Sequence, residues 1–157
     1  DGDLASIGLS EILMAANRGE HITIFFANNS TYGMTGGQMA PTTLVGQKST
    51  TCIHGREPDT MGYPLRMCEL IKELEAPVYV ARFSLSSPAN IRKAKAGIKK
   101  AMQNQAEGLG FSFVELLTNC PTNWHMSPVQ TLDFINEHTM KYFPCKVFVD
   151  KTEKEAK

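Results

Sequence analysis

The chain has 157 residues, of which 42% are apolar and 20% are charged, which fits one globular domain with a buried core and excludes a disordered chain. Its 16 Lys and Arg balance its 16 Asp and Glu, so neither nucleic acid nor an anionic membrane is expected as a partner. The longest apolar runs fall far short of the roughly 20 residues that a membrane-spanning helix needs.

The chain opens on a helix pattern that is followed by a strand pattern. Residues 4–18 predict a helix that stops at Gly19. The continuous apolar run ITIFFA at 22–27 is typical of a strand buried on both faces. Because the first residue is Asp1 and a motif begins there, we expect a fragment or a processed piece, with the first strand of the leading unit upstream.

A long polar stretch separates this unit from the next one. Residues 45–61 predict a loop, and a loop of this length in a compact domain is usually functional or mobile. Residues 64–75 then predict a helix with Pro64 in its first turn, and residues 78–85 predict a strand.

A basic helix comes next, in the segment SSPANIRKAKAGIKKAMQNQAEG. It combines a Ser cap, a Pro in the first turn and a stop at Gly108. Apolar residues at helical spacing mark one face, namely Ile91, Ala94, Ile98 and Met102. The basic residues could form a docking patch, but in a neutral chain a solvated face explains them better: Arg92, Lys93, Lys95, Lys99 and Lys100.

The chain closes with a predicted strand at 111–117, a helix at 127–141 opened by Ser127 and Pro128, and a strand at 146–150. Strands and helices that alternate in this way predict an α/β domain with a mostly parallel sheet and helices on both faces. We expect residues 1–150 to form this domain and residues 151–157 to be a charged tail.

The four cysteines show neither a CxxC pair nor zinc-finger spacing: Cys52, Cys68, Cys120 and Cys145. A chain of this length does not need disulfides, so we expect free or buried thiols in a reducing, cytoplasmic setting. Cys120 stands apart because it lies in TNCPTNWHMSP, between a predicted strand and a predicted helix.

Two turn-rich segments lie where strands of the leading unit end. DGD at 1–3 would follow the upstream strand, and the uncharged NNSTYGMTGGQMAPTT at 28–43 follows the strand at 22–27. Loops after parallel strands meet at one edge of the sheet, where ligands bind, so Asp1 and Asn29 can converge. A carboxylate and an amide oxygen, with a backbone carbonyl, suit Mg²⁺ that bridges to phosphates.

The glycines of these segments suit phosphate binding. Gly2 opens a helix whose N–H groups can approach a phosphate, and Gly33, Gly36 and Gly37 allow backbone that wraps an anion. Taken singly, DG, NN and GG are ordinary turn pairs. Together, on matching edges of one βαβ unit, they favour a metal–phosphate site.

DG followed at this interval by NN resembles the thiamine diphosphate motif GDG…NN. DGDLASIG, NNSTYGMTGGQMAPTT and CPTNW together are similar to the β subunit of 2-oxoacid:ferredoxin oxidoreductases, from residue 1 to about residue 150. By this resemblance Asp1, Asn29 and the carbonyl of Thr31 hold Mg²⁺. Five residues would contact the diphosphate end of the cofactor: Gly2, Asp3, Gly33, Met34 and Thr35.

The resemblance also implies a [4Fe–4S] cluster with Cys120 as one of its four thiolates and the other three outside this chain. The implied activity is thiamine diphosphate-dependent oxidative decarboxylation of a 2-oxo acid, either 2-oxoglutarate or a branched-chain acid. Coenzyme A accepts the acyl group and ferredoxin the electrons. An α/γ-type partner subunit holds the aminopyrimidine end of the cofactor, so no catalytic acid or base is expected on this chain.

Two departures from the family pattern and two alternatives stay open. The chain has no CxxC, so it cannot build the cluster alone, and His125 and Cys52 receive no role. His21 and His138 are better explained as structural or solvated residues, which leaves His54 as the histidine to test. The alternatives are a non-catalytic module that binds Mg–diphosphate and a non-oxidative decarboxylase, which would have no use for a thiolate at Cys120.

Overall fold

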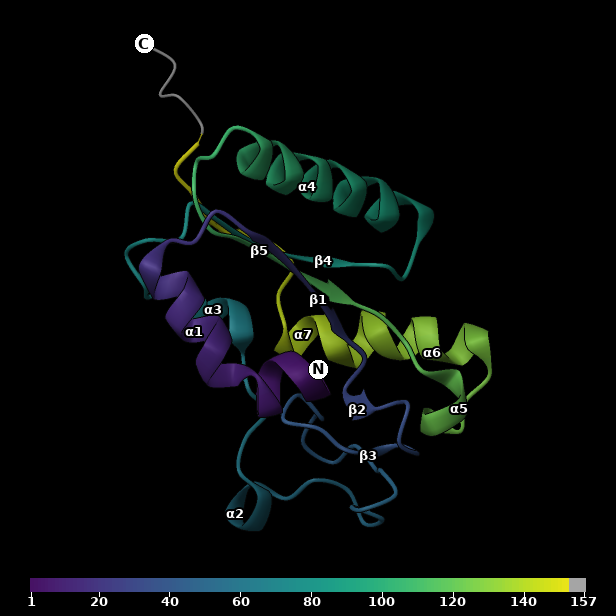
Figure 1. The fold of residues 1–157 in the computed structure, drawn as a ribbon. Coiled ribbons are helices and arrows are strands. Elements are labelled where there is room, and N and C mark those ends of the chain that lie inside the picture. Colours follow the sequence, from purple (N-terminus) through teal and green to yellow (C-terminus); the bar gives the residue numbers. More distant parts are fainter. Residues whose placement is uncertain (153–157) are drawn as a thin grey trace.

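The computed structural model describes residues 1–152, and Figure 1 shows a central sheet with helices on both faces. The sheet has the strand order β1-β5-β4-β6. Its strands are β1 (Thr23–Asn28), β5 (Ser112–Leu117), β4 (Tyr79–Ser84) and β6 (Val147–Asp150). The first three run parallel and β6 runs antiparallel to β4. The prediction of a mostly parallel α/β sheet is therefore confirmed.

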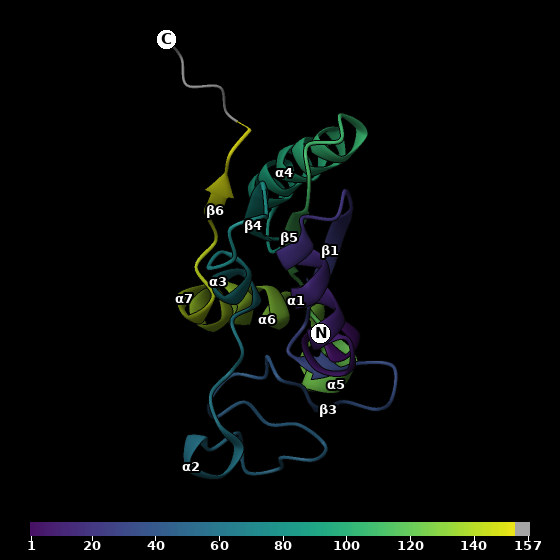
Figure 2. The same cartoon turned by 60° about the vertical axis from the view of Figure 1, so that its left-hand side comes forward.

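Helices cover the two faces of the sheet. A π-helical turn η1 (Asp3–Ile7), α1 (Leu9–Arg18) and α3 (Met67–Ile71) lie on one face, and α4 (Pro88–Ala106) lies on the other (Figures 1 and 2). The main core lies between the sheet and the first group of helices, around Phe26, Val80 and Phe113, which are fully buried. Burial of each such side chain stabilises the fold by about 1.5–3 kcal/mol.

The predicted helix at 4–18 forms with a break at Gly8 between η1 and α1. It ends as expected at Gly19, which is left-handed at φ 68° and donates its N–H to Ala16 O at 3.0 Å. The strand at 22–27 also forms, but the prediction that both of its faces are buried is wrong. Phe25 and Ala27 are exposed because α4 packs mainly on β4 and β5 and leaves this part of the edge strand uncovered.

The helix predicted at 64–75 is shorter, because α3 spans only Met67–Ile71. Pro64 lies outside it, so its predicted place in the first turn is wrong. Leu65 instead donates its N–H to Pro41 O at 2.9 Å, and Arg66 is extended at φ −103°. Contacts with a distant loop thus hold these residues out of the helix.

The helix α4 begins at the predicted Ser cap, where Ser87 accepts from the N–H of Asn90. Its buried face differs from the predicted one, since Ile91 and Met102 are exposed. The buried residues are mostly small: Ala94, Gly97, Ala101 and Asn104. A Cβ at Gly97 would lie 2.2 Å from Phe83 Cε2, so the helix approaches the sheet too closely for a larger residue.

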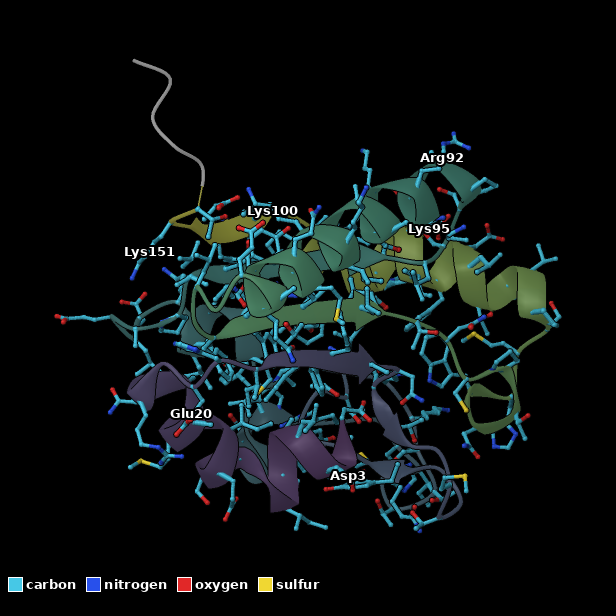
Figure 3. All side chains as sticks on the ribbon, turned by 45° about the horizontal axis from the view of Figure 1, so that its top comes forward. Asp3, Glu20, Arg92, Lys95, Lys100 and Lys151 are labelled. Atoms are coloured by element: carbon cyan, nitrogen blue, oxygen red, sulfur yellow. The ribbon has the colours of Figure 1, made fainter. Side chains whose placement is uncertain are left out.

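Four basic residues of α4 are exposed, namely Arg92, Lys93, Lys95 and Lys99. Figure 3 labels Arg92 and Lys95 along this helix and Asp3 on the other side of the sheet. Lys100 is half-buried and forms an ion pair with Asp150. A solvated face is therefore the better description of the four exposed residues.

The segment after β5 folds at the carboxyl edge of the sheet. It contains α5 (Pro121–Trp124), α6 (Pro128–Phe134), a π-helical turn η2 (Ile135–Thr139) and α7 (Met140–Tyr142). Ser127 and Gln130 form a capping box at the start of α6, as expected for a helix opened at Ser127. Because the chain re-enters the sheet directly from this edge, β6 runs antiparallel to β4.

Residues 29–63 form a layer beyond the same edge (Figure 2). It contains the two-stranded sheet of β2 (Thr31–Tyr32) and β3 (Gln38–Met39) and the short helix α2 (Pro58–Met61). Within residues 1–152, no helix is both long and apolar enough to cross a bilayer. Residues 153–157 of the expected charged tail lie outside the described residues.

Candidate functional site

Asp1 and Asn29 meet at one backbone N–H group beyond the end of β1. Thr31 N donates to Asp1 Oδ2 at 3.0 Å and to Asn29 Oδ1 at 3.2 Å. Thr42 Oγ1 also donates to Asp1 Oδ2, at 2.8 Å. Two residues that are 28 positions apart in sequence therefore present oxygens side by side at the carboxyl edge of the sheet, and carboxylate and amide oxygens are of the kind that Mg²⁺ takes as ligands.

A cavity of about 420 Å³ lies next to this pair of oxygens. The residues singled out from sequence all line it: Asp1, Gly2, Asp3, Asn29, Thr31, Gly33, Met34 and Thr35. Ala27 and Tyr32 complete the lining. The structure thus gathers every residue predicted to bind Mg²⁺ or the diphosphate around one space, whose lining includes two carboxylates, one amide and backbone groups that offer oxygen ligands and N–H donors.

Two glycines in this region leave no room for a side chain. A Cβ at Gly2 would lie 2.4 Å from Tyr32 Cδ1, so the start of η1 packs directly on the aromatic ring of β2. Gly37 is left-handed at φ 83°, and a Cβ there would lie 3.0 Å from the side chain of Asn123. These close approaches bring the DGD and CPTNW segments against the loop that follows β1.

Cys120 is a free, half-buried thiol at the start of α5. Asn123 Nδ2 donates to Cys120 Sγ at 3.2 Å and to Gly33 O at 3.0 Å. Trp124 Nε1 donates to Asn29 O at 3.0 Å. The cysteine is thereby fastened to the loop that carries Asn29, and it packs beside the apolar cluster of Leu117 and Trp124.

A metal centre built only from ionisable side chains is not found among residues 1–152, where no three His, Cys, Asp or Glu residues gather. An iron–sulfur cluster that used Cys120 would therefore need its remaining ligands from outside the described residues. The Asp1 site is different, because its second side-chain oxygen belongs to an amide.

Met34 is fully exposed and lines the cavity. Met34 therefore does not pack onto the sheet as a core residue. All four histidines are exposed: His21, His54, His125 and His138. His125 ends α5 in a left-handed conformation at φ 53°, which gives it a local structural place.

Sequence reasoning missed a group of buried polar residues that support the site from behind. Arg82 in β4 and Glu115 in β5 are completely buried and form an ion pair at 2.8 Å. Burial disfavours the charged form of Arg82, yet its hydrogen bonds to Glu69 and the charge of Glu115 raise its pKa above the usual value. The signal was a single charged residue in each of two apolar strands, VYVARFSL and FSFVELL.

The long loop holds a second missed residue, Arg56, which is 5% exposed. Its guanidinium donates to six backbone carbonyls, those of Ala40, Pro41, Thr43, Met61, Gly62 and Tyr63. It therefore ties the segment before the loop to the segment after it. Two threonines in the segment before the loop contact the site: Thr42 donates to Asp1 Oδ2, and Thr43 donates to Ser30 O at 2.6 Å.

Residues 1–116 match the family model described as thiamine pyrophosphate enzyme, C-terminal TPP binding domain. The chain belongs to this family. All residues that line the cavity lie within the matched residues, whereas Cys120, Asn123 and Trp124 lie beyond them. The fold and the family expected from the GDG…NN resemblance are thereby confirmed.

Relatives of this TPP-binding domain are subunits of 2-oxoacid oxidoreductases. It is 53% identical over 152 residues to ketoisovalerate oxidoreductase subunit VorA of Methanothermobacter marburgensis, which covers 97% of the chain and 32% of VorA. It is 36% identical over 145 residues to 2-oxoglutarate synthase subunit KorB of the same organism, which covers 89% of the chain and 47% of KorB. The chain thus spans about a third to a half of the length of these relatives.

A solved structure has the same fold as the TPP-binding domain. It is 2-oxoglutarate:ferredoxin oxidoreductase from Magnetococcus marinus, with 2-oxoglutarate, coenzyme A and succinyl-CoA bound. The match has a TM-score of 0.74 at 23% identity and covers 98% of the chain and 55% of that chain.

Proposed function

We propose that this chain is the Mg²⁺- and diphosphate-binding part of the β subunit of a 2-oxoacid:ferredoxin oxidoreductase. The observation that carries the proposal is the convergence of Asp1 Oδ2 and Asn29 Oδ1 on Thr31 N, beside a cavity lined by all the predicted site residues. The kinship with VorA and KorB supports the reaction class. An α/γ-type partner subunit, coenzyme A and ferredoxin would complete the enzyme.

The residues of this chain would bind and orient the cofactor. Asp1, Asn29 and the carbonyl of Thr31 would hold Mg²⁺. The diphosphate would lie against Gly2, Asp3, Gly33, Met34 and Thr35, where backbone N–H groups can reach its oxygens. Thiamine diphosphate, when bound, supplies the electron sink for decarboxylation of a 2-oxo acid. No acid or base of the reaction is assigned to this chain, because the partner subunit would contact the aminopyrimidine end.

The substrate class follows from the relatives. The identity to a ketoisovalerate oxidoreductase subunit, 53%, exceeds the 36% to a 2-oxoglutarate synthase subunit, which favours a branched-chain 2-oxo acid. The test is CoA-dependent reduction of ferredoxin by the complete enzyme with 2-oxoisovalerate and with 2-oxoglutarate. If the complete enzyme turns over neither acid, the proposal is overturned. A cytoplasmic location is proposed because all four cysteines are free thiols.

Cys120→Ser in the complete enzyme is expected to lower both the visible absorbance of the cluster and the rate of ferredoxin reduction. We expect a loss of roughly tenfold or more, since disturbing the coordination of a protein-bound metal commonly costs 10- to 100-fold. Thiamine diphosphate binding should survive, because Cys120 is not among the residues that line the cavity and its thiol accepts a hydrogen bond from Asn123 at the edge of the loop.

Cys145→Ser is the matched control for this variant. Cys145 is also half-buried and packs beside the same apolar cluster, and burial raises the pKa of its thiol to about 11. Unchanged ferredoxin reduction and cluster absorbance in Cys120→Ser would exclude Cys120 as a ligand of the cluster. A wild-type enzyme that releases an aldehyde and does not reduce ferredoxin would favour the non-oxidative decarboxylase instead.

Met34→Phe is expected to change kcat/KM unequally for 2-oxoisovalerate and 2-oxoglutarate. An exposed, flexible side chain at the cavity can contact the variable end of the substrate. A shape change of this kind is worth roughly 1–3 kcal/mol, or about 10- to 200-fold in discrimination. Met14→Phe is the control, because Met14 is also exposed but lies on α1, away from the cavity lining. Equal losses on both acids would mean that Met34 does not select the substrate.

A further inference from the structure

Three strands of the sheet carry a connected set of buried polar side chains that ends at the candidate site. Arg82 Nε donates to Glu115 Oε2 at 2.8 Å, and both side chains are fully buried. The other carboxylate oxygen, Glu115 Oε1, accepts from Asn28 Nδ2 at 2.8 Å. Asn28 is also fully buried and is the last residue of β1, so the set reaches the point where the site begins.

Asn28 passes this contact on to the turn that presents Asn29. Its Oδ1 accepts from the N–H of Ser30 at 3.1 Å. Ser30 is buried and left-handed at φ 60°, a backbone conformation that is costly for a residue with a side chain and needs support from its surroundings. The next N–H along the chain, that of Thr31, is the one shared by Asp1 and Asn29.

The chemistry of these contacts requires a carboxylate at position 115. Both of its neighbours, Arg82 Nε and Asn28 Nδ2, are donors, and a carboxylate accepts on both oxygens. Because the nitrogen of the Asn28 amide must face Glu115, its oxygen must face Ser30. Glu115 therefore selects the orientation of the amide that supports the left-handed turn.

Stability alone gives little reason to bury this pair of charges. The cost of removing two charges from water commonly equals or exceeds their attraction, and an apolar pair of similar volume often replaces a buried ion pair without loss. The outer end of the set is anchored in α3, where the Glu69 carboxylate accepts hydrogen bonds from both terminal nitrogens of Arg82, at 3.0 Å from Nη1 and 2.6 Å from Nη2. The inner end is directed at the turn of the site.

We propose that Glu115 is a positioning residue for the metal–diphosphate site. Through Asn28 it fixes the turn at Ser30, and this turn places Asn29 Oδ1 beside Asp1 Oδ2. Loss of the carboxylate then weakens Mg²⁺ binding although Glu115 touches neither metal nor cofactor. This inference rests on the proposed function, because it assigns Glu115 a role toward the same Mg²⁺.

A swap of the two side chains tests the inference. In Glu115→Gln an amide nitrogen faces either Arg82 or Asn28, and in Asn28→Asp two carboxylates face each other. Each single variant should weaken the affinity for Mg²⁺ by tenfold or more. In the double variant Glu115→Gln/Asn28→Asp, the Gln nitrogen donates to the Asp and its oxygen accepts from Arg82. The charge of the pair is unchanged, and affinity should return to within about threefold of the wild type.

The measurement is calorimetric titration of Mg²⁺ into the complete, assembled enzyme with thiamine diphosphate present. Glu69→Gln is the control, because it weakens the anchor of Arg82 but leaves the contact between Glu115 and Asn28 intact. It should lower the melting temperature and leave the Mg²⁺ affinity close to that of the wild type. If Glu115 had only a structural role, every variant would lose stability and the swap would not recover Mg²⁺ affinity.

Three outcomes overturn the inference in distinguishable ways. If the wild-type enzyme binds Mg²⁺ and thiamine diphosphate and Glu115→Gln binds Mg²⁺ equally well, only the positioning role of Glu115 is excluded. Losses of Mg²⁺ affinity in the single variants that the double variant does not recover also remove the positioning role. If Glu115→Gln fails to fold, the Mg²⁺ affinity of Asn28→Asp is compared with that of the double variant, and recovery in the double variant supports the role. A wild-type enzyme that binds no thiamine diphosphate overturns the proposed function and this inference together.

Discussion

Asp1→Asn in the complete enzyme is expected to weaken Mg²⁺-dependent binding of thiamine diphosphate by about 100-fold or more. Residues that only orient a ligand commonly cost 10- to 100-fold when changed, so loss of the one side-chain carboxylate among the proposed ligands should cost at least as much. An Asn at position 1 keeps an oxygen that can accept from Thr31 N and Thr42 Oγ1. The fold should therefore persist.

Asp1→Ala separates the metal from the support that Asp1 gives to the loop. It is expected to abolish cofactor binding and also to destabilise the domain by roughly 1–3 kcal/mol, because two hydrogen bonds to a partly buried carboxylate are lost. Asp59→Ala, at an exposed carboxylate in α2, is the control. Isothermal titration with and without Mg²⁺ measures the effect, and full affinity in Asp1→Asn would exclude Asp1 as a ligand.

Local patterns in the sequence correctly predicted those helices and strands whose bounds do not depend on contacts with distant segments. The strands β4 and β5 and the helix α4 form close to their predicted bounds because their periodicity and caps are local properties. The errors arise where a distant segment decides. Leu65 bonds to Pro41 instead of entering α3, and α4 buries its small residues because it lies close to Phe83. Helical spacing alone does not report that distance.

The candidate site shows the same division. The convergence of Asp1 and Asn29 could be predicted because their motifs were expected to follow consecutive parallel strands, and the two side chains do meet at one edge of the sheet. Their supports could not be found in this way, since Thr42, Arg56 and Glu115 reach the site through contacts between distant segments. A charged residue inside an apolar strand was a visible signal, but the sequence did not tell which partner it would meet.

Arg56→Met is expected to unfold residues 40–63, the larger part of the layer beyond the carboxyl edge, while the main sheet persists. The guanidinium of Arg56 donates to six carbonyls from two segments, and burial lowers its pKa from the usual value without removing its charge. Hydrogen bonds to a charged group contribute about 1.5–3 kcal/mol each and are not additive. We expect a total loss of about 3–5 kcal/mol, at the upper end for single substitutions.

Arg56→Lys should recover only part of this stability, because an ammonium has three donors and cannot span both segments as a planar guanidinium does. Hydrogen exchange of peptides covering residues 40–63 measures the local effect, and urea unfolding measures the global one. Lys48→Met, at an exposed cation of the same loop, should stay within about 0.5 kcal/mol of the wild type. Since Thr42 and Thr43 connect residues 40–63 to Asp1 and Ser30, Arg56→Met should also weaken Mg²⁺ binding. Fast exchange at 40–63 with unchanged Mg²⁺ affinity would show that residues 40–63 do not support the site.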